Sequence, residues 1–168
     1  MRKLSQGERH KVSFTLNGKS VSGWAAPRML LTDFLRRELG ETGTHVGCEH
    51  GVCGACTVRL DGDAVRACLC LAVQADGRAV DTVEGLAETG GALTAMQTAF
   101  RKHHALQCGY CTPGLLMSLS DLFERTPNPN EEQLRDVVGG HLCRCTGYAG
   151  IMAAAREVAG LSGNGEAE

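Results

Sequence analysis

Nine cysteines are the side chains most able to do chemistry in this chain of 168 residues. Cys48, Cys53 and Cys56 have the spacing C-x4-C-x2-C, and eleven residues separate Cys56 from Cys68. A second group has the spacings C-x2-C and C-x-C, with 31 residues between them, and comprises Cys108, Cys111, Cys143 and Cys145. Thiols at such spacings bind metal ions, hold iron–sulfur clusters or form redox-active disulfides.

The first group indicates an iron–sulfur cluster, because C-x4-C-x2-C is the spacing with which plant-type ferredoxins hold [2Fe–2S]. Gly47, Gly51 and Gly54 supply the positive φ angles and missing side chains that let backbone N–H groups approach the sulfurs. Cys68 comes sooner than the fourth cysteine of stand-alone plant ferredoxins, which indicates a relative of that fold. Cys70 shares a face with Cys68 and competes with it as a ligand, unless it is a small buried hydrophobe. Structural zinc and free thiols are the alternatives.

The second group indicates another cluster. A thioredoxin-like dithiol needs its C-x-x-C between a strand and a helix, whereas a helical pattern precedes Cys108. Zinc knuckles usually space their cysteines C-x2–4-C, for which C-x-C is tight. Cys111 and Cys145 each lie just before a predicted helix, whose positive N-terminal end favours an anionic cluster. We expect the nearby His103 and His104 to form a polar helix end.

The composition excludes several classes of protein. The 17 basic and 19 acidic residues nearly balance, so no nucleic-acid-binding surface is predicted. The apolar stretches are too short to span a membrane, and the basic N-terminus lacks the apolar segment of a secretory signal. We therefore expect a cytoplasmic protein with reduced thiols, since a disulfide framework normally uses an even number of cysteines.

The elements expected in the first half are strands and one helix. Residues 11–24 and 56–69 alternate around Asn-Gly and Asp-Gly turns, which predicts two β-hairpins. Residues 78–85 predict a further strand. Pro27 lies in the expected first turn of a helix over 27–40. Two hairpins crossed by one helix indicate a β-grasp-like unit.

After about residue 86 the pattern changes to helices. We expect four of them, over residues 92–105, 112–125, 130–138 and 147–160. Thr112 is the expected N-cap of the second helix, followed by a proline, and Asn130 is that of the third. The chain is thus predicted to be α+β, with one domain over 10–86, a four-helix domain over 87–161 and a disordered tail over 162–168.

The cysteine-containing segments resemble those of a known family. The segments "GCEHGVCGACTVRLDG", "RACLCLAVQADG", "TVEGL", "LQCGYCTPG" and "HLCRCTGY", in this order, resemble the small iron–sulfur subunit of the molybdenum hydroxylases. That family includes xanthine dehydrogenase, aldehyde oxidase, aerobic carbon monoxide dehydrogenase and quinoline oxidoreductase. The resemblance covers roughly residues 10–160, and it implies a plant-ferredoxin-like β-grasp domain followed by an all-α four-helix domain.

The resemblance also implies which residues bind the cofactors. Each domain would hold one [2Fe–2S] cluster. The ligands would be Cys48, Cys53, Cys56 and Cys68 in the first domain, and Cys108, Cys111, Cys143 and Cys145 in the second. The register with the family selects Cys68 over Cys70. The second cluster would lie beside the pterin of the molybdenum cofactor, with Gln107 and Cys145 in contact with that pterin.

Function and partners follow from the same resemblance. The chain would be the electron-transfer subunit of a heterotrimer, doubled to a dimer of heterotrimers. Electrons would pass from the molybdopterin cytosine dinucleotide centre of a large subunit, through both clusters, to FAD on a medium subunit. An N-heteroaromatic compound such as quinoline is the expected substrate, with carbon monoxide, an aldehyde or a purine as alternatives. A stand-alone two-cluster ferredoxin or redox sensor, and a zinc-stabilised scaffold, are the competing functions.

Overall fold

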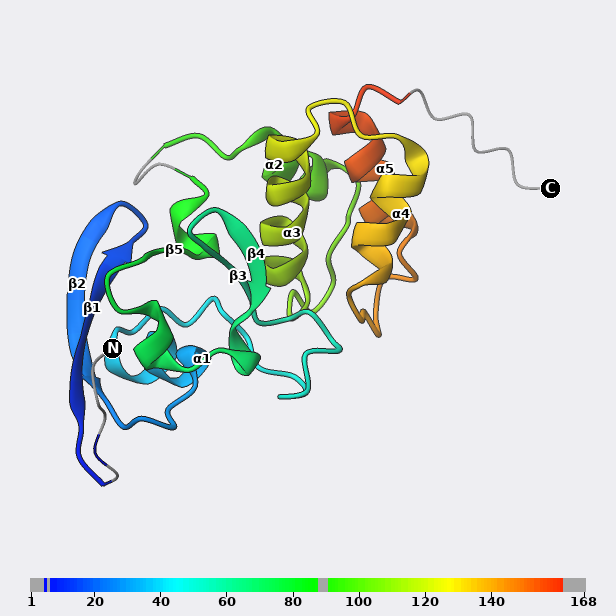
Figure 1. Cartoon of the computed structure of the whole chain (residues 1–168). Coiled ribbons are helices and arrows are strands. Elements are labelled where there is room, and N and C mark those ends of the chain that lie inside the picture. Colours follow the sequence, from blue (N-terminus) through cyan, green and yellow to red (C-terminus); the bar gives the residue numbers. More distant parts are fainter. Residues whose placement is uncertain (1–4, 6, 88–90, 162–168) are drawn as a thin grey trace.

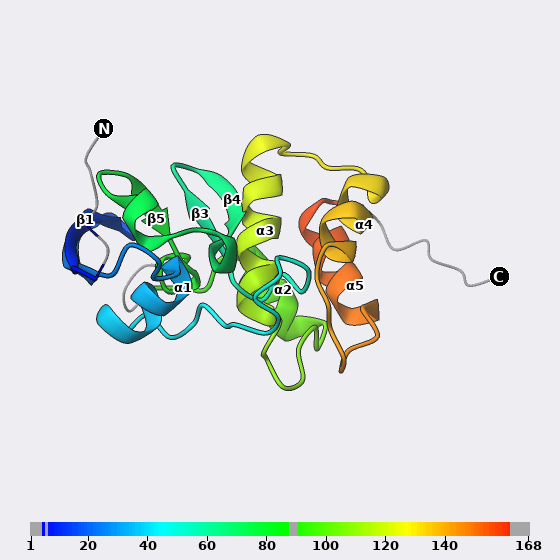
Figure 2. The same ribbon diagram turned by 60° about the horizontal axis from the view of Figure 1, so that its bottom comes forward.

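The computed structural model describes residues 5, 7–87 and 91–161. They form a sheet-containing half and a helical half that lie side by side (Figure 1, Figure 2). The strands come first along the chain, and helices α2 to α5 follow at the other end of the molecule (Figure 1). The predicted α+β fold is therefore confirmed. The predicted tail over 162–168 lies outside the described residues.

The first half is built on a five-stranded sheet in the order β2-β1-β5-β3-β4. The strands are β1 (His10–Leu16), β2 (Lys19–Ala25), β3 (Thr57–Leu60), β4 (Asp63–Arg66) and β5 (Ala79–Asp81). Both predicted hairpins are confirmed, since β1 pairs antiparallel with β2, and β3 with β4. Both residues of the Asn-Gly and Asp-Gly turns have positive φ, as type I′ turns require. β5 pairs parallel with β1 and antiparallel with β3, and it thereby joins the two hairpins into one mixed sheet.

The helix expected after Pro27 is shorter than predicted. α1 (Leu31–Asp33) is a single turn, and it continues as a π-helix over Phe34–Glu38. Leu30 is extended, with φ of −68° and ψ of 148°, because it forms an isolated β-bridge with the segment that follows Cys68. The helix therefore begins only after Leu30, and Pro27 lies in the turn before it.

The second half contains the four predicted helices. They are α2 (Ala95–Lys102), α3 (Thr112–Arg125), α4 (Glu131–Gly139) and α5 (Ala149–Val158). Asn130 caps α4 as expected, since its side chain accepts a hydrogen bond from the N–H of Gln133. The predicted N-cap of α3 is wrong by one residue. Cys111 is the N-cap, because its carbonyl accepts the first helical hydrogen bond, from the N–H of Leu115 at 3.1 Å, and Thr112 is the first helical residue.

Each half has its own hydrophobic core. In the first half, α1 and the π-helix pack on the sheet, and the buried side chains include Val12, Phe14, Leu31, Phe34 and Val58. In the second half the four helices surround buried side chains that include Phe100, Leu115, Leu134 and Ile151. Burial of apolar side chains is the main stabilising contribution to each half.

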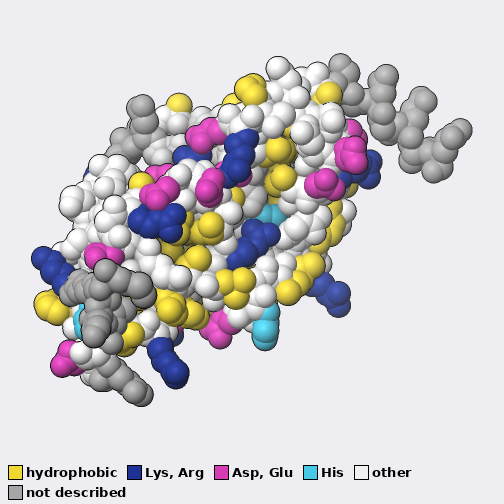
Figure 3. Space-filling view, in the orientation of Figure 1, with side chains coloured by type: hydrophobic (Ala, Val, Ile, Leu, Met, Phe, Trp, Pro, Cys, Tyr) yellow, Lys and Arg dark blue, Asp and Glu magenta, His cyan; other side chains and the backbone are white. Residues whose placement is uncertain are grey.

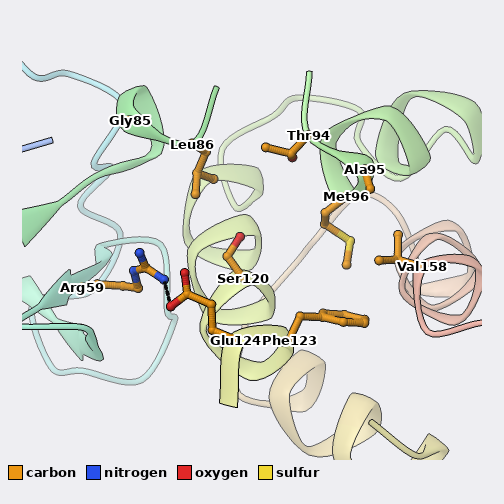
Figure 4. A pocket seen from close by; sticks show the side chains of 10 residues that line it. All are labelled: Arg59, Gly85, Leu86, Thr94, Ala95, Met96, Ser120, Phe123, Glu124 and Val158. Atoms are coloured by element: carbon orange, nitrogen blue, oxygen red, sulfur yellow. Dashed lines mark ion pairs between the residues drawn. The ribbon is translucent and has the colours of Figure 1, made fainter. Parts of the chain in front are cut away.

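α3 joins the two halves, because it also packs against β3 and β4 (Figure 2). Arg59 on β3 forms an ion pair with Glu124 on α3, which Figure 4 shows beside a cavity of about 490 Å³ between the halves. Arg125 on α3 pairs with Asp63 of β4 at 2.8 Å. The two halves are thus connected by charged pairs as well as by packing.

The charges on the surface are mixed. On the face shown in Figure 3, basic and acidic side chains are interspersed. On the helical half, Arg156 of α5 binds Glu131 of α4 at 2.5 Å and holds the pKa of this carboxyl at about 2. Among the described residues, the helices are too short or too polar to cross a membrane.

Candidate iron–sulfur centres

The eight predicted ligand thiols lie in four pairs. The pairs are Cys48–Cys53, Cys56–Cys68, Cys108–Cys145 and Cys111–Cys143. The Sγ atoms of Cys108 and Cys145 are 3.5 Å apart. Two thiolates on one tetrahedral metal, each bound at about 2.3 Å, lie roughly 3.7 Å apart. This spacing therefore suits two ligands of one iron atom.

Pairs of thiols fit a binuclear cluster. Within residues 5, 7–87 and 91–161, no three His, Cys, Asp or Glu side chains converge as they would on one metal ion. A [2Fe–2S] cluster held by four cysteines takes two thiolates for each of its two irons. The donor set, which is all sulfur and arranged two by two in each half, matches that requirement.

The loop of the first group directs backbone N–H groups toward the thiol of Cys48. The N–H groups of Cys53 and His50 each lie 3.4 Å from its sulfur, and they lower the pKa of this thiol to about 6. Gly51 and Gly54 allow the loop to fold this way, with φ of +78° and +77°. Because the thiolate is the form that binds metal, the loop prepares Cys48 for ligation.

Cys56 and Cys68 form the buried pair of the first group. The N–H of Cys68 points at the sulfur of Cys56, 3.5 Å away, and burial raises the pKa of Cys56 to about 12. A bound metal ion removes the proton from such a thiol and compensates its charge. Cys70 is half-buried against the first core, where burial raises the pKa of its thiol. That position suits the packing role expected of Cys70.

In the second group, Cys111 lies at the N-terminus of α3 as expected, but Cys145 does not lie next to a helix. α5 begins at Ala149 and not at Gly147, because Tyr148 before it has a left-handed backbone with φ of +65°. The expected contribution of a second helix N-terminus next to Cys145 is therefore wrong. Thr146 lies in the intervening turn.

The turn before α5 supports Cys143. The hydroxyl of Thr146 lies 3.1 Å from its sulfur, and the N–H of Cys143 donates to the Tyr148 hydroxyl at 2.9 Å. Burial alone would raise the pKa of Cys143, but the hydrogen bonds with Thr146 lower it to about 7. Burial raises the pKa of its partner Cys111 to about 12. The pair formed by Cys111 and Cys143 thus combines one easily ionised thiol with one that needs a metal to ionise.

Gln107 lies at the exposed edge of the second group. Its side-chain amide donates a 3.0 Å hydrogen bond to the carbonyl of Cys145, and the thiols of Cys145 and Cys108 are exposed beside it. His103 instead ends α2 and contacts Glu157 on α5 at 2.5 Å, which fits the expected polar helix end.

The loops of the two groups meet at the joint between the halves. The N–H of Leu142, next to Cys143, donates a 3.0 Å hydrogen bond to the carbonyl of Cys53. His141 is buried against Gly54, where an added Cβ would lie 2.3 Å from its Nδ1 atom. Its Nε2 atom lies 2.8 Å from the hydroxyl of Ser118 on α3.

A role for His141 was not predicted from the sequence, because its contacts are with residues that lie far away in the chain. Burial and the nearby Arg66 lower the pKa of its imidazole to about 4, so it is neutral near pH 7. Its partners Ser118 and Gly54 lie 23 and 87 positions earlier in the chain, so no local pattern pointed to the contact. The one available signal was Gly54 itself, since a glycine between ligands permits close approach.

Two family models match the chain. The model described as "2Fe-2S iron-sulfur cluster binding domain" matches residues 14–87. The model described as "[2Fe-2S] binding domain" matches residues 82–156. The matches coincide with the sheet-containing half and the helical half.

Relatives match along most of their length. Caffeine dehydrogenase subunit gamma of Pseudomonas sp. (strain CBB1) is 51% identical over 152 residues, which cover 89% of this chain and 90% of that protein. Nicotine 6-hydroxylase small subunit of Paenarthrobacter nicotinovorans is 48% identical, covering 95% and 96%. The structure of quinoline 2-oxidoreductase from Pseudomonas putida 86 matches with a TM-score of 0.87 and 46% identity, covering 96% of this chain and 100% of that one. The chain belongs to the small [2Fe–2S] subunits of the molybdenum hydroxylases.

As a small molybdenum hydroxylase subunit, the chain is the electron-transfer component of an oxidoreductase complex. Its two [2Fe–2S] clusters supply one-electron transfer, and they connect the molybdopterin and FAD of partner subunits. The predicted family, function and cofactors are thereby confirmed. The competing function of a stand-alone ferredoxin has no support in these relatives, which are named as subunits.

Proposed function

We propose that this subunit relays electrons for the hydroxylation of an N-heteroaromatic substrate, and that its eight paired cysteines are the cluster ligands. The pairing of thiols carries the ligand assignment, with Cys108 and Cys145 at 3.5 Å as its clearest case. The substrate class is supported by the relatives, which are named for caffeine, nicotine and quinoline. Each of these compounds contains an aromatic nitrogen heterocycle.

The chain's own residues prepare each site for its cluster. The backbone N–H groups of His50 and Cys53 stabilise negative charge on Cys48, and Thr146 does so for Cys143. The buried thiol of Cys56 ionises only when a metal compensates its charge. The first site therefore offers one thiol that ionises readily and one whose negative charge requires a bound metal.

Gln107 and Cys145 are proposed to contact the pterin of the large subunit. Both are exposed and are joined by a 3.0 Å hydrogen bond, so together they form one polar edge at the surface of the second group. An amide can donate and accept hydrogen bonds at once, which suits contact with a pterin.

We further propose a cytoplasmic dimer of heterotrimers, with this chain divided into domains over 10–86 and 87–161. Two separate hydrophobic cores support the division. Mass spectrometry of the intact complex under native conditions tests the assembly, since a dimer of heterotrimers has two copies of each subunit. A complex with one copy of each subunit would contradict the proposed dimer.

Activity of the assembled complex tests the substrate class. Quinoline, nicotine and caffeine should be oxidised with higher kcat/KM than an aldehyde or carbon monoxide. An aldehyde as the preferred substrate would overturn the N-heteroaromatic assignment. It would leave the ligand assignment untouched, because that assignment is tested separately by the iron content of cysteine variants.

A further inference from the structure

Tyr110 belongs to the loop of the second cysteine group, but its side chain contacts the loop of the first. It lies between Cys108 and Cys111 in the sequence. Its ring stacks on the imidazole of His45, with ring centroids 4.6 Å apart and an interplanar angle of 16°. Its hydroxyl donates a 2.7 Å hydrogen bond to the carbonyl of Val46. The side chain therefore reaches from one proposed cluster loop to the other.

The backbone of Tyr110 is held by the same neighbour. Its carbonyl oxygen lies 2.8 Å from Nδ1 of His45. A carbonyl oxygen only accepts hydrogen bonds, so Nδ1 of His45 carries the proton in this contact. His45 thus binds Tyr110 twice, through its ring face and through its N–H.

The ring of Tyr110 also lies close to the proposed ligands of the first cluster. A Cβ atom on Gly47 would lie 3.6 Å from Cε1 of Tyr110 and 3.1 Å from the sulfur of Cys53. The tyrosine ring and a proposed ligand thus flank the same glycine. Gly47 directly precedes Cys48, which is another proposed ligand.

We propose that His45 and Tyr110 form a clamp that fixes the distance and orientation between the two clusters, which makes Tyr110 a positioning residue for electron transfer between them. The proposal rests on the cysteine ligands proposed above. The hydrogen bond from Leu142 to Cys53 joins the same two cysteine groups at another point. Contacts at separate points restrict the relative orientation of the two loops more than any one of them does alone.

Because the clamp is partly exposed, a role in positioning the clusters can be distinguished from a role in folding. The side chain of Tyr110 is 47% exposed, and His45 is half-buried. Neither belongs to the two hydrophobic cores of the described residues. Removing the ring therefore takes little apolar surface out of a core, while it removes the stack and a hydrogen bond between the loops.

The test compares Tyr110→Ala, Tyr110→Phe and wild type in the assembled complex. Both reduced [2Fe–2S] clusters are paramagnetic, and the dipolar interaction between two spins falls with the inverse cube of their separation. We expect Tyr110→Ala to retain its iron and sulfide, to lose the magnetic splitting between the clusters in electron paramagnetic resonance (EPR), and to pass electrons from the second cluster to the first more slowly. Tyr110→Phe keeps the stack on His45 and should retain most of the splitting. Trp24→Ala, which removes another exposed aromatic side chain on β2, is the control and should match wild type.

Wild-type splitting and electron-transfer rate in Tyr110→Ala would overturn the clamp. If that variant lost iron, His45→Leu would decide, because it removes the clamp from outside the C-G-Y-C loop. Full iron with weakened splitting in His45→Leu would support the proposal, and full iron with wild-type splitting would overturn it. Iron loss in both variants would also overturn it, because the pair would then serve cluster retention. Failure of the ligand assignment appears elsewhere, as unchanged iron in the cysteine variants.

Discussion

A Cβ atom on Gly114 would lie 2.2 Å from the carbonyl oxygen of Gly54, so the first turn of α3 and the first cysteine loop touch backbone to backbone. The same carbonyl accepts hydrogen bonds from the N–H and the hydroxyl of Thr57, at 3.1 and 2.7 Å. It is therefore fixed in place and cannot move aside for a side chain. The close approach of the two cysteine groups therefore depends on Gly54 in the first group and on Gly114 in α3.

Gly114→Ala should lower the free energy of unfolding by about 1–3 kcal/mol, because the added methyl group overpacks the joint. Gly139→Ala is the matched control, since Gly139 also lies in a helix but an added Cβ there meets nothing within 4 Å. Urea unfolding of both variants, followed by circular dichroism, measures the difference. Equal stability of the two variants would show that the contact between Gly114 and Gly54 can widen without lowering the free energy of unfolding.

Cys68→Ser should remove the cluster of the first half, whereas Cys70→Ser should leave both clusters intact. Cys68 directs its N–H at the sulfur of Cys56, while Cys70 packs on the first core. Iron quantification in the two variants decides between them. Loss of iron in the Cys70 variant alone would identify Cys70 as the ligand.

The wild-type chain should contain about four irons and equal sulfide, in two distinguishable one-electron [2Fe–2S] centres. Quantification of iron, sulfide and zinc, together with EPR of the fully reduced complex, measures this. A colourless protein with stoichiometric zinc would support the scaffold alternative. Half the iron with a single EPR species would contradict two sites.

Gln107→Ala should retain both clusters but weaken retention of the molybdenum cofactor or slow the first electron transfer. The variant loses the amide that donates to the Cys145 carbonyl and that we place against the pterin. A buried polar group left without its partner costs about 1–3 kcal/mol. Molybdenum content and pre-steady-state cluster reduction measure the effect. Gln107→Glu, which cannot donate this bond, should behave like the alanine variant, and full activity in both would withdraw the pterin contact.

The ion pair between α4 and α5 should make stability depend on pH in acid. Arg156 lowers the folded-state pKa of Glu131 to about 2, from about 4.3 for an ordinary glutamate. The stabilisation is therefore fully present above about pH 4.3 and is lost as the pH falls toward 2. Because the side chain of Glu131 is 40% exposed, we expect only about 1 kcal/mol at neutral pH.

Glu131→Gln should thus destabilise the chain at pH 7, by an amount that shrinks as the pH falls below 4. Glu132→Gln is the matched control, because it removes a charge from the same first turn of α4 and so cancels the helix-dipole contribution. Comparing the two variants in urea unfolding isolates the ion pairs that Glu131 forms with Arg156 and with Arg135. An equal loss of stability in both variants at pH 7 would assign the effect to the helix dipole.

Local chemistry explains which elements were predictable. The Asn-Gly and Asp-Gly turns have positive φ at both residues, as type I′ turns require. A segment of about four residues was therefore enough to predict each hairpin. The helix after Pro27 was overestimated, because a β-bridge formed by Leu30 keeps that residue extended. Propensity cannot foresee a pairing with Leu71, which lies 41 positions further along the chain.

In the candidate sites, too, some features were predictable from the sequence and others were not. The spacing of the cysteines, together with the family resemblance, predicted the eight thiols that the structure places in pairs. The contacts that bring the two groups together were not predictable, since His141, Tyr110 and Gly114 meet partners more than twenty residues away. Such contacts depend on how two domains pack, and no periodicity or motif in the sequence indicates that packing.

The exposure of Cys108 and Cys145 has a consequence for the biogenesis of the enzyme. Oxygen and chelators reach a cluster most easily through its unprotected ligands, whereas the pair formed by Cys56 and Cys68 is buried. Before it joins the large subunit, the chain should therefore lose its second cluster in air sooner than its first. Prompt docking onto the large subunit, or a chaperone that shields this edge, would prevent that loss during maturation.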